Sequence, residues 1–187
     1  MTPEPTGFAE RAPAVRALPA VLYDRHVTDL GKRVHLLVRA EGSTVATAES
    51  LTGGRLAVRF TDVPGVSETY LGGVVTYATQ LKTSVLDVDQ EVVDAHGVVS
   101  AECAEAMASG VRALTGATYG LSTTGVAGPD TQEGKPAGTV YVGLAGPGFV
   151  TSELLHLDGG RDAIQEATCE AVLAALEVRL REQTALR

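Results

Sequence analysis

The chain has 187 residues and a formal net charge of −8 at pH 7, and 44% of its residues are hydrophobic. This length suits one domain with a sizeable buried core. The negative charge argues against a general nucleic-acid binder, because neutralising phosphates needs a basic face, and no apolar run approaches the ~18 residues of a membrane span. The acidic, proline-rich start does not resemble a secretory signal. We therefore expect a cytoplasmic protein that binds neither nucleic acid nor membranes.

Proline and cysteine usage bears on how the chain is organised. Four of the eight prolines fall within the first nineteen residues. We therefore predict a poorly ordered N-terminal extension over 1–22 and a single domain over 23–187. Cys103 and Cys169 show no metal-ligand spacing and lie in helical patterns. We expect both to be free, buried thiols, as in a reducing compartment.

The hydrophobic pattern predicts alternating helices and strands. Helices are expected over 30–40, 56–60, 79–86, 89–95, 101–114 and 161–181, and strands over 44–48, 73–77, 119–124, 139–145 and 149–157. This order, closed by one hairpin, indicates a three-layer α/β/α sandwich with a mixed sheet. Ligands in such folds bind where the strands end, so we expect the loops 49–55, 77–82 and 125–134 to converge.

The most informative stretch is Thr44-Val-Ala-Thr-Ala-Glu-Ser-Leu-Thr-Gly-Gly-Arg55. It is typical of a buried strand that breaks into a tight turn and then opens a helix. The turn offers the Ser50 hydroxyl and free backbone N–H groups, and a helix start adds a partial charge of roughly +0.5. Such a place binds an anion or holds a nucleophile beside an oxyanion hole.

A serine hydroxyl needs a neighbouring base before it can act as a nucleophile. None of the four histidines follows one of the three converging strands, and the Gly-x-Ser-x-Gly elbow of hydrolases is absent. Tyr77 and Lys82 are better placed, since a desolvated lysine can act as a general base and a phenol can relay a proton. The pattern alone leaves a second interpretation open, in which Tyr77 caps the core and Lys82 lies along the surface.

The glycine-rich segment Gly125–Lys135 does not match a phosphate-binding P-loop. Five residues separate Gly128 from Gly134, one too many, and Pro136 stands where that motif has a serine or threonine. A loop that wraps a small ligand with its backbone amides and a simple crossover into the hairpin both remain open. The acidic residues show no metal-binding spacing, and we expect neither a metal nor a cofactor.

Five segments agree in order and spacing with one known family. They are Ala46–Gly54, Tyr77 with Lys82 five residues on, His96–Ser100, Thr124–Pro129 and Lys135–Val140. Over roughly 30–180 the chain thus resembles the CinA C-terminal domain family, the nicotinamide-mononucleotide deamidases. The resemblance implies the same sandwich, with a mostly parallel sheet of about five strands and one antiparallel strand.

The resemblance also implies hydrolysis of the carboxamide of nicotinamide mononucleotide, which yields nicotinate mononucleotide and ammonia. Ser50 would be the nucleophile, and Tyr77 and Lys82 its proton-transferring partners. The expected substrate-binding residues are Thr52, Gly53, Gly54, Thr124, Gly125, Ala127, Gly128, Lys135 and Arg161. Within this set we expect the N–H groups of 52–54 to hold the oxyanion and Arg161 to hold the phosphate. We also expect a homo-oligomer.

The chain departs from the family pattern at several positions. Asp130-Thr-Gln132 stands where the family tends towards glycines, Gln165 stands in place of an arginine, and Leu51 in place of a cysteine. Two alternatives to the deamidase therefore stay open. One is a non-catalytic ligand- or partner-binding module with an accessory role in competence or DNA damage, and the other is a hydrolase of another small amide.

Overall fold

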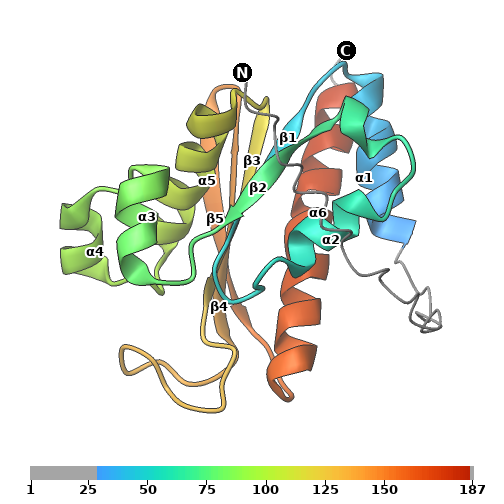
Figure 1. Ribbon diagram of the computed structural model, residues 1–187. Helices are drawn as coiled ribbons and strands as arrows, with labels where there is room; N and C mark the ends of the chain where they lie inside the picture. Colours follow the sequence, from blue (N-terminus) through green and yellow to red (C-terminus); the bar gives the residue numbers. More distant parts are fainter. Residues whose placement is uncertain (1–28, 186–187) are drawn as a thin grey trace, which may run out of the picture.

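The computed structural model describes residues 29–185, so the predicted extension over 1–22 lies outside the described residues. Every predicted helix and strand is present (Figure 1). The helices are α1 (Asp29–Ala40), α2 (Arg55–Thr61), α3 (Thr79–Leu86), α4 (Gln90–His96), α5 (Ala101–Thr115) and α6 (Arg161–Ala185), with a short 3-10 helix η1 (Val66–Glu68) that the sequence pattern did not indicate. The strands are β1 (Val45–Glu49), β2 (Tyr70–Val75), β3 (Tyr119–Gly125), β4 (Thr139–Gly146) and β5 (Phe149–His156).

The strands form one mixed sheet in the order β2-β1-β3-β4-β5. Strand β1 pairs in parallel with both β2 and β3, whereas β4 is antiparallel to β3 and to β5. Strand β4 is thus the one antiparallel strand that was expected. Two of the four strand pairings are antiparallel, because the hairpin of β4 and β5 adds antiparallel neighbours at one side of the sheet. Counted by pairings, the sheet is therefore not mostly parallel.

Helices cover both faces of the sheet, which confirms the α/β/α layers (Figure 1). Helices α1, α2 and α6 pack on one face in a core cluster that includes Val34, Phe60 and Leu173. Helices α3, α4 and α5 lie on the other face, where Leu86 and Met107 belong to a second cluster. Both cysteines are buried and free, as predicted. Within residues 29–185, no helix combines the length and the apolar character that crossing a bilayer requires.

Strand β2 begins and ends earlier than the expected 73–77. Gly72 and Gly73 both lie inside the strand. Residue 73 has to be a glycine, because a Cβ atom there would come within 2.1 Å of the Thr47 hydroxyl on β1. The ladder ends where the Thr76 N–H donates to the last carbonyl of β1, at 2.8 Å. As a result Tyr77 lies in the loop after the strand and not in the strand.

Candidate active site

Ser50 directly follows β1, at the carboxyl end of the parallel strands. Its backbone N–H donates to the carbonyl of Thr123 on the neighbouring strand β3, at 3.0 Å. Along β1 successive side chains alternate between the two faces of the sheet. Glu49 therefore faces α2, and Ser50 faces α3 and α5.

The Glu49 carboxylate fills the N-terminus of α2. Only 1% exposed, it accepts hydrogen bonds from the backbone N–H groups of Gly54, Leu56 and Ala57, at 2.8, 3.1 and 2.8 Å. The Thr52 hydroxyl donates to the same carboxylate at 2.8 Å. A helix start leaves such N–H groups without partners inside the helix, and a negative charge there complements the helix dipole. The anion at this helix start is thus one of the protein's own side chains.

This arrangement corrects the expectation that Gly53, Gly54 and the Thr52 side chain bind substrate, and among these three residues it leaves only the backbone N–H of Thr52 without an acceptor in the part of the chain that the structure describes. The Gly54 N–H is engaged by Glu49, and the Gly53 N–H donates to the Ser50 carbonyl at 3.2 Å. The Thr52 side chain is buried against the Glu49 carboxylate. None of the three lines the pocket next to Ser50. The turn uses these groups to hold its own shape.

Lys82 lies behind Ser50, in the first turns of α3. Its Nζ donates to Ser50 Oγ at 3.0 Å and to the Thr76 carbonyl at 2.7 Å, so the predicted contact between Ser50 and Lys82 is confirmed. The side chain is only 1% exposed. Burial lowers the pKa of Lys82, while the nearby Cys103 and Glu133 act in the opposite direction. A lowered pKa makes the neutral amine, the form that can accept a proton, more accessible.

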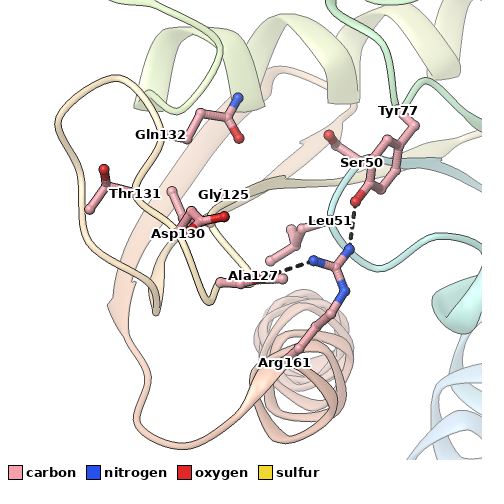
Figure 2. Close-up of a pocket in the computed structure, with 11 residues that line it drawn as sticks. Ser50, Leu51, Tyr77, Gly125, Ala127, Asp130, Thr131, Gln132 and Arg161 are labelled. Atoms are coloured by element: carbon pink, nitrogen blue, oxygen red, sulfur yellow. Dashed lines mark hydrogen bonds between the residues drawn. The ribbon is translucent and has the colours of Figure 1, made fainter.

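Among residues 29–185 no hydrogen bond joins Tyr77 to Ser50 or Lys82, so the hydrogen-bonded cluster contains Ser50 and Lys82 without Tyr77. It is 56% exposed, and its hydroxyl accepts a hydrogen bond from Arg161 at 2.5 Å. The same guanidinium donates to the carbonyl of Gly128 at 2.9 Å. Arg161 thus bridges the loop after β2 and the loop after β3, as Figure 2 shows. The reason for the difference is that Tyr77 lies beyond the end of β2 and not within the strand.

A pocket of about 270 Å³ opens where the three expected loops converge (Figure 2). The predicted site residues that line it are Ser50, Tyr77, Gly125, Ala127, Gly128 and Arg161. Five further lining residues were not predicted as binding residues, and they are Leu51, Val126, Asp130, Thr131 and Gln132. The sequence signals for these five were their place in two of the converging loops and, for Leu51 and 130–132, their departure from the family pattern.

Two other predicted binding residues, Thr124 and Lys135, do not line this pocket. The Thr124 hydroxyl is buried and donates to the Val98 carbonyl at 2.5 Å, because alternation along β3 points it at the α5 side. Lys135 lies farther along the loop, with Nζ 4.0 Å from Glu133. In the described structure both residues help to hold the loop or the sheet in place.

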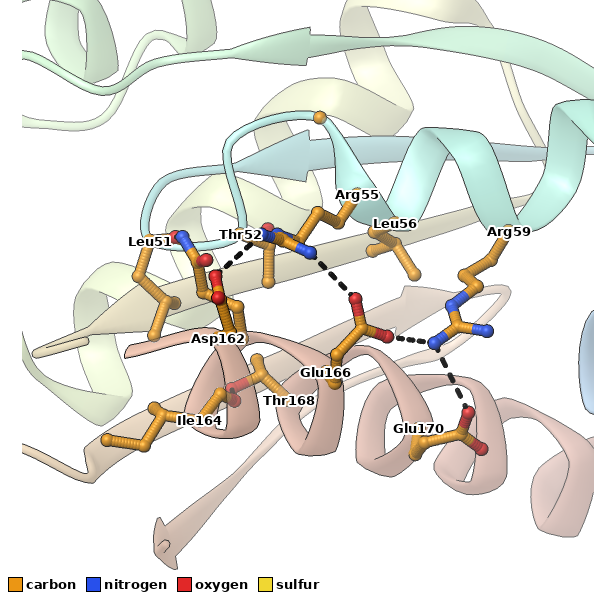
Figure 3. Close-up of polar contacts among 12 residues, drawn as sticks. Leu51, Thr52, Arg55, Leu56, Arg59, Asp162, Ile164, Glu166, Thr168 and Glu170 are labelled. Carbon is orange, nitrogen blue, oxygen red and sulfur yellow. Dashed lines mark hydrogen bonds and ion pairs between the residues drawn. The ribbon is translucent and has the colours of Figure 1, made fainter. Parts of the chain in front are cut away.

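Helices α2 and α6 are joined by a group of ion pairs, drawn in Figure 3. Arg55 contacts Asp162 and Glu166, each at 2.9 Å. Arg59 contacts Glu166 and, at 3.7 Å, Glu170. Because α2 follows the Ser50 turn and α6 begins at the pocket, these contacts fix the two walls of the site relative to each other.

Gln165 adds a buried contact between α6 and the Ser50 turn. Its Nε2 donates to the carbonyl of Leu51 at 2.6 Å. The resemblance described above implies an arginine at this position. The amide keeps a donor at this position without adding a second cation to the pocket.

The CinA C-terminal domain family matches residues 27–180 of the chain. The chain belongs to this family. A "CinA-like protein" of Frankia casuarinae is 52% identical over 143 residues, which cover 76% of this chain and 32% of that relative. A "putative competence-damage inducible protein" of Bacillus subtilis is 40% identical over 154 residues, which cover 80% of this chain and 37% of that relative. The chain thus spans about a third of the length of these CinA relatives.

Solved structures of the CinA superfamily share the fold. One from Klebsiella pneumoniae has a TM-score of 0.81 and 32% sequence identity, and the match covers 84% of this chain and 99% of that one. The competence/damage inducible protein CihA of Agrobacterium tumefaciens has a TM-score of 0.78 and 32% identity, with 83% and 95% covered. These matches confirm the fold class and the family.

Proposed function

We propose that this CinA domain hydrolyses the carboxamide of nicotinamide mononucleotide to nicotinate mononucleotide and ammonia. The observation that carries the proposal is the 3.0 Å contact between Lys82 Nζ and Ser50 Oγ beside the pocket. A serine becomes a nucleophile when a neighbouring base takes its proton. Among residues 29–185 no histidine lines the pocket. Lys82 is therefore assigned as the base.

Neutral Lys82 can serve both of its contacts at once. One N–H donates to the Thr76 carbonyl, and the nitrogen lone pair is then available to accept the Ser50 proton across the 3.0 Å contact. The Ser50 hydroxyl then donates its proton to Nζ as Oγ attacks the carboxamide carbon. Burial, which lowers the pKa of Lys82, favours this starting state.

Three further proton transfers complete the reaction. The Lys82 ammonium passes its proton to the amide nitrogen, the carbon–nitrogen bond breaks, and ammonia leaves an ester on Ser50. Water then attacks the ester carbon and gives a proton to Lys82, which returns it to Oγ as the ester bond breaks. The products are the nucleotide carboxylate, ammonia and the proton that the acid releases.

We assign the oxyanion to the backbone N–H groups of Leu51 and Thr52. Among residues 29–185 neither has an acceptor, unlike those of Gly53 and Gly54. Free donors next to the nucleophile are what an oxyanion hole requires. Gln165 holds the Leu51 carbonyl, and in a trans peptide the following N–H points the opposite way. Gln165 is thus a positioning residue for the Thr52 N–H.

The substrate phosphate is assigned to Arg161. Its planar guanidinium suits phosphate oxygens, and it reaches the pocket from the start of α6. Tyr77 contacts Arg161 and not the reacting atoms. Its proposed role is therefore to orient the guanidinium, and proton transfer falls to Lys82.

The proposal is tested by incubating the purified protein with nicotinamide mononucleotide and measuring ammonia and nicotinate mononucleotide. Equal amounts of the two products are expected. Nicotinamide riboside, which lacks the phosphate, and glutamine serve as comparison amides. Ammonia from another amide alone would favour a different hydrolase, and no release from any amide would favour the binding module.

A further inference from the structure

The pocket contains two opposite charges that the protein does not neutralise. Asp130 and Arg161 both line it, and they do not form an ion pair with each other. In the part of the chain that the structure describes, Asp130 has neither an ion pair nor a hydrogen bond, and the acceptors of Arg161 are a carbonyl and a phenol, both uncharged. Figure 2 shows Asp130 on the loop after β3, across the pocket from Ser50 and Arg161.

Charges left without partners in a pocket gain most from a ligand that supplies both counter-charges. A guanidinium has five N–H donors, and Arg161 uses two of its nitrogens on protein oxygens. Donors therefore remain for an anionic group. The Asp130 carboxylate can only accept hydrogen bonds or pair with a cation while ionised. A purely anionic ligand would satisfy Arg161 and be repelled by Asp130.

We propose that Asp130 is a specificity-determining residue that pairs with the positively charged ring of a zwitterionic pyridinium nucleotide. This inference rests on the proposed function and adds to it the recognition of ring charge. Nicotinamide mononucleotide carries a cationic ring at one end and an anionic phosphate at the other. Its carboxamide lies on the ring, so the ring must approach Ser50, and the phosphate would then extend towards Arg161.

The consequence is discrimination by charge between two ligands of nearly equal shape. The 1,4-dihydro form of the mononucleotide keeps the carboxamide, the ribose and the phosphate, but its ring is neutral. Asp130 should favour the oxidised form over this dihydro form. A partly solvated charge pair is worth about a tenfold change in dissociation constant.

Binding of the two mononucleotides is measured by calorimetry in a Ser50→Ala background, which removes the nucleophile and so prevents turnover during the titration. We expect the oxidised form to bind about tenfold more tightly than the dihydro form. Adding Asp130→Asn should weaken binding of the oxidised form about tenfold and of the dihydro form less than twofold. Glu153→Gln, an equal change of charge at an exposed position of β5 outside the pocket, should alter neither.

If Asp130→Asn weakened the binding of both forms equally, the inference would be overturned, because Asp130 would then not recognise the charge of the ring. Tighter binding of both forms by Asp130→Asn would place the phosphate beside Asp130 and would also overturn the inference. The inference would be overturned too if neither nucleotide bound to the Ser50→Ala protein. Failure of the proposed function looks different. In that case the wild-type protein releases no ammonia, although charge discrimination in binding persists.

Discussion

Lys82 is the residue on which the proposed chemistry depends. It is one of only three lysines in the chain, against twelve arginines, and it is buried against Ser50 Oγ and the Thr76 carbonyl. An arginine in the same place could supply charge but could not lose its proton. A lysine at this position therefore points to proton transfer as its role.

Replacing Lys82 separates charge from basicity. We expect Lys82→Arg to lower kcat for deamidation nearly as much as Lys82→Met, by about 10²- to 10⁴-fold, because neither variant has a base beside Ser50. Steady-state kinetics with nicotinamide mononucleotide measures this. Lys32→Arg, on the exposed side of α1, is the matched control and should keep wild-type kcat. A Lys82→Arg variant with most of its activity would make Lys82 an electrostatic clamp.

The lowered pKa of Lys82 also sets the direction of the pH dependence. Only the neutral amine accepts the Ser50 proton, so kcat/KM should rise with pH as Lys82 loses its proton. Because burial lowers this pKa, the midpoint of the rise should lie below 10.5, the ordinary lysine value. A pH profile of kcat/KM measures the midpoint. A rise centred at or above the ordinary value, or an unchanged rise in Lys82→Met, would assign the titration to another group.

At the scale of elements, the junction of β1, its turn and α2 positions the nucleophile. The contact between Ser50 and Lys82 could be predicted from the sequence, because parallel strands place their following loops at one edge of the sheet. Which anion occupies the N-terminus of α2 could not be predicted from the sequence. Residues 52–54 look equally suited to an external anion and to an internal one, and only the direction of the Glu49 side chain decides between them.

Removing the charge of Glu49 should loosen this junction. Glu49→Gln keeps the size of the side chain but replaces one acceptor oxygen with an amide NH2 group, a donor that faces the N–H donors of the α2 start. We expect a loss of about 3 kcal/mol in the free energy of unfolding, because a buried, charged set of hydrogen bonds is broken. Urea denaturation followed by circular dichroism measures it. The matched control Glu91→Gln, on the exposed first turn of α4, should cost less than about 1 kcal/mol.

A Glu49→Gln variant as stable as the wild type would show that the carboxylate is not what holds the α2 start. Its activity adds a second readout. If the turn also positions the N–H groups of Leu51 and Thr52, kcat should fall in Glu49→Gln more than KM rises.

At the scale of the whole molecule, the layers and the order of elements follow from the hydrophobic pattern, because helices and strands bury their apolar residues at different periods. The predicted start of β2 at Gly73 was too late, because a glycine there looks like the first residue of a strand, whereas Gly73 lies inside the strand and leaves room for the Thr47 side chain on β1. Tyr77 was placed wrongly because the ladder between β1 and β2 already ends at Thr76. Long-range contacts of this kind, including that between Gln165 and Leu51, leave no periodic signal in the sequence.

Because Ser50 is proposed as the nucleophile of an amidohydrolase, the decisive measurement is ammonia release from nicotinamide mononucleotide by Ser50→Ala. Ser43→Ala, in the loop before β1 and at the far end of that strand, is the control. We expect Ser50→Ala to lose at least about a thousandfold in kcat while Ser43→Ala keeps the wild-type rate. A folded Ser50→Ala protein that releases ammonia at the wild-type rate would show that Ser50 is not the nucleophile.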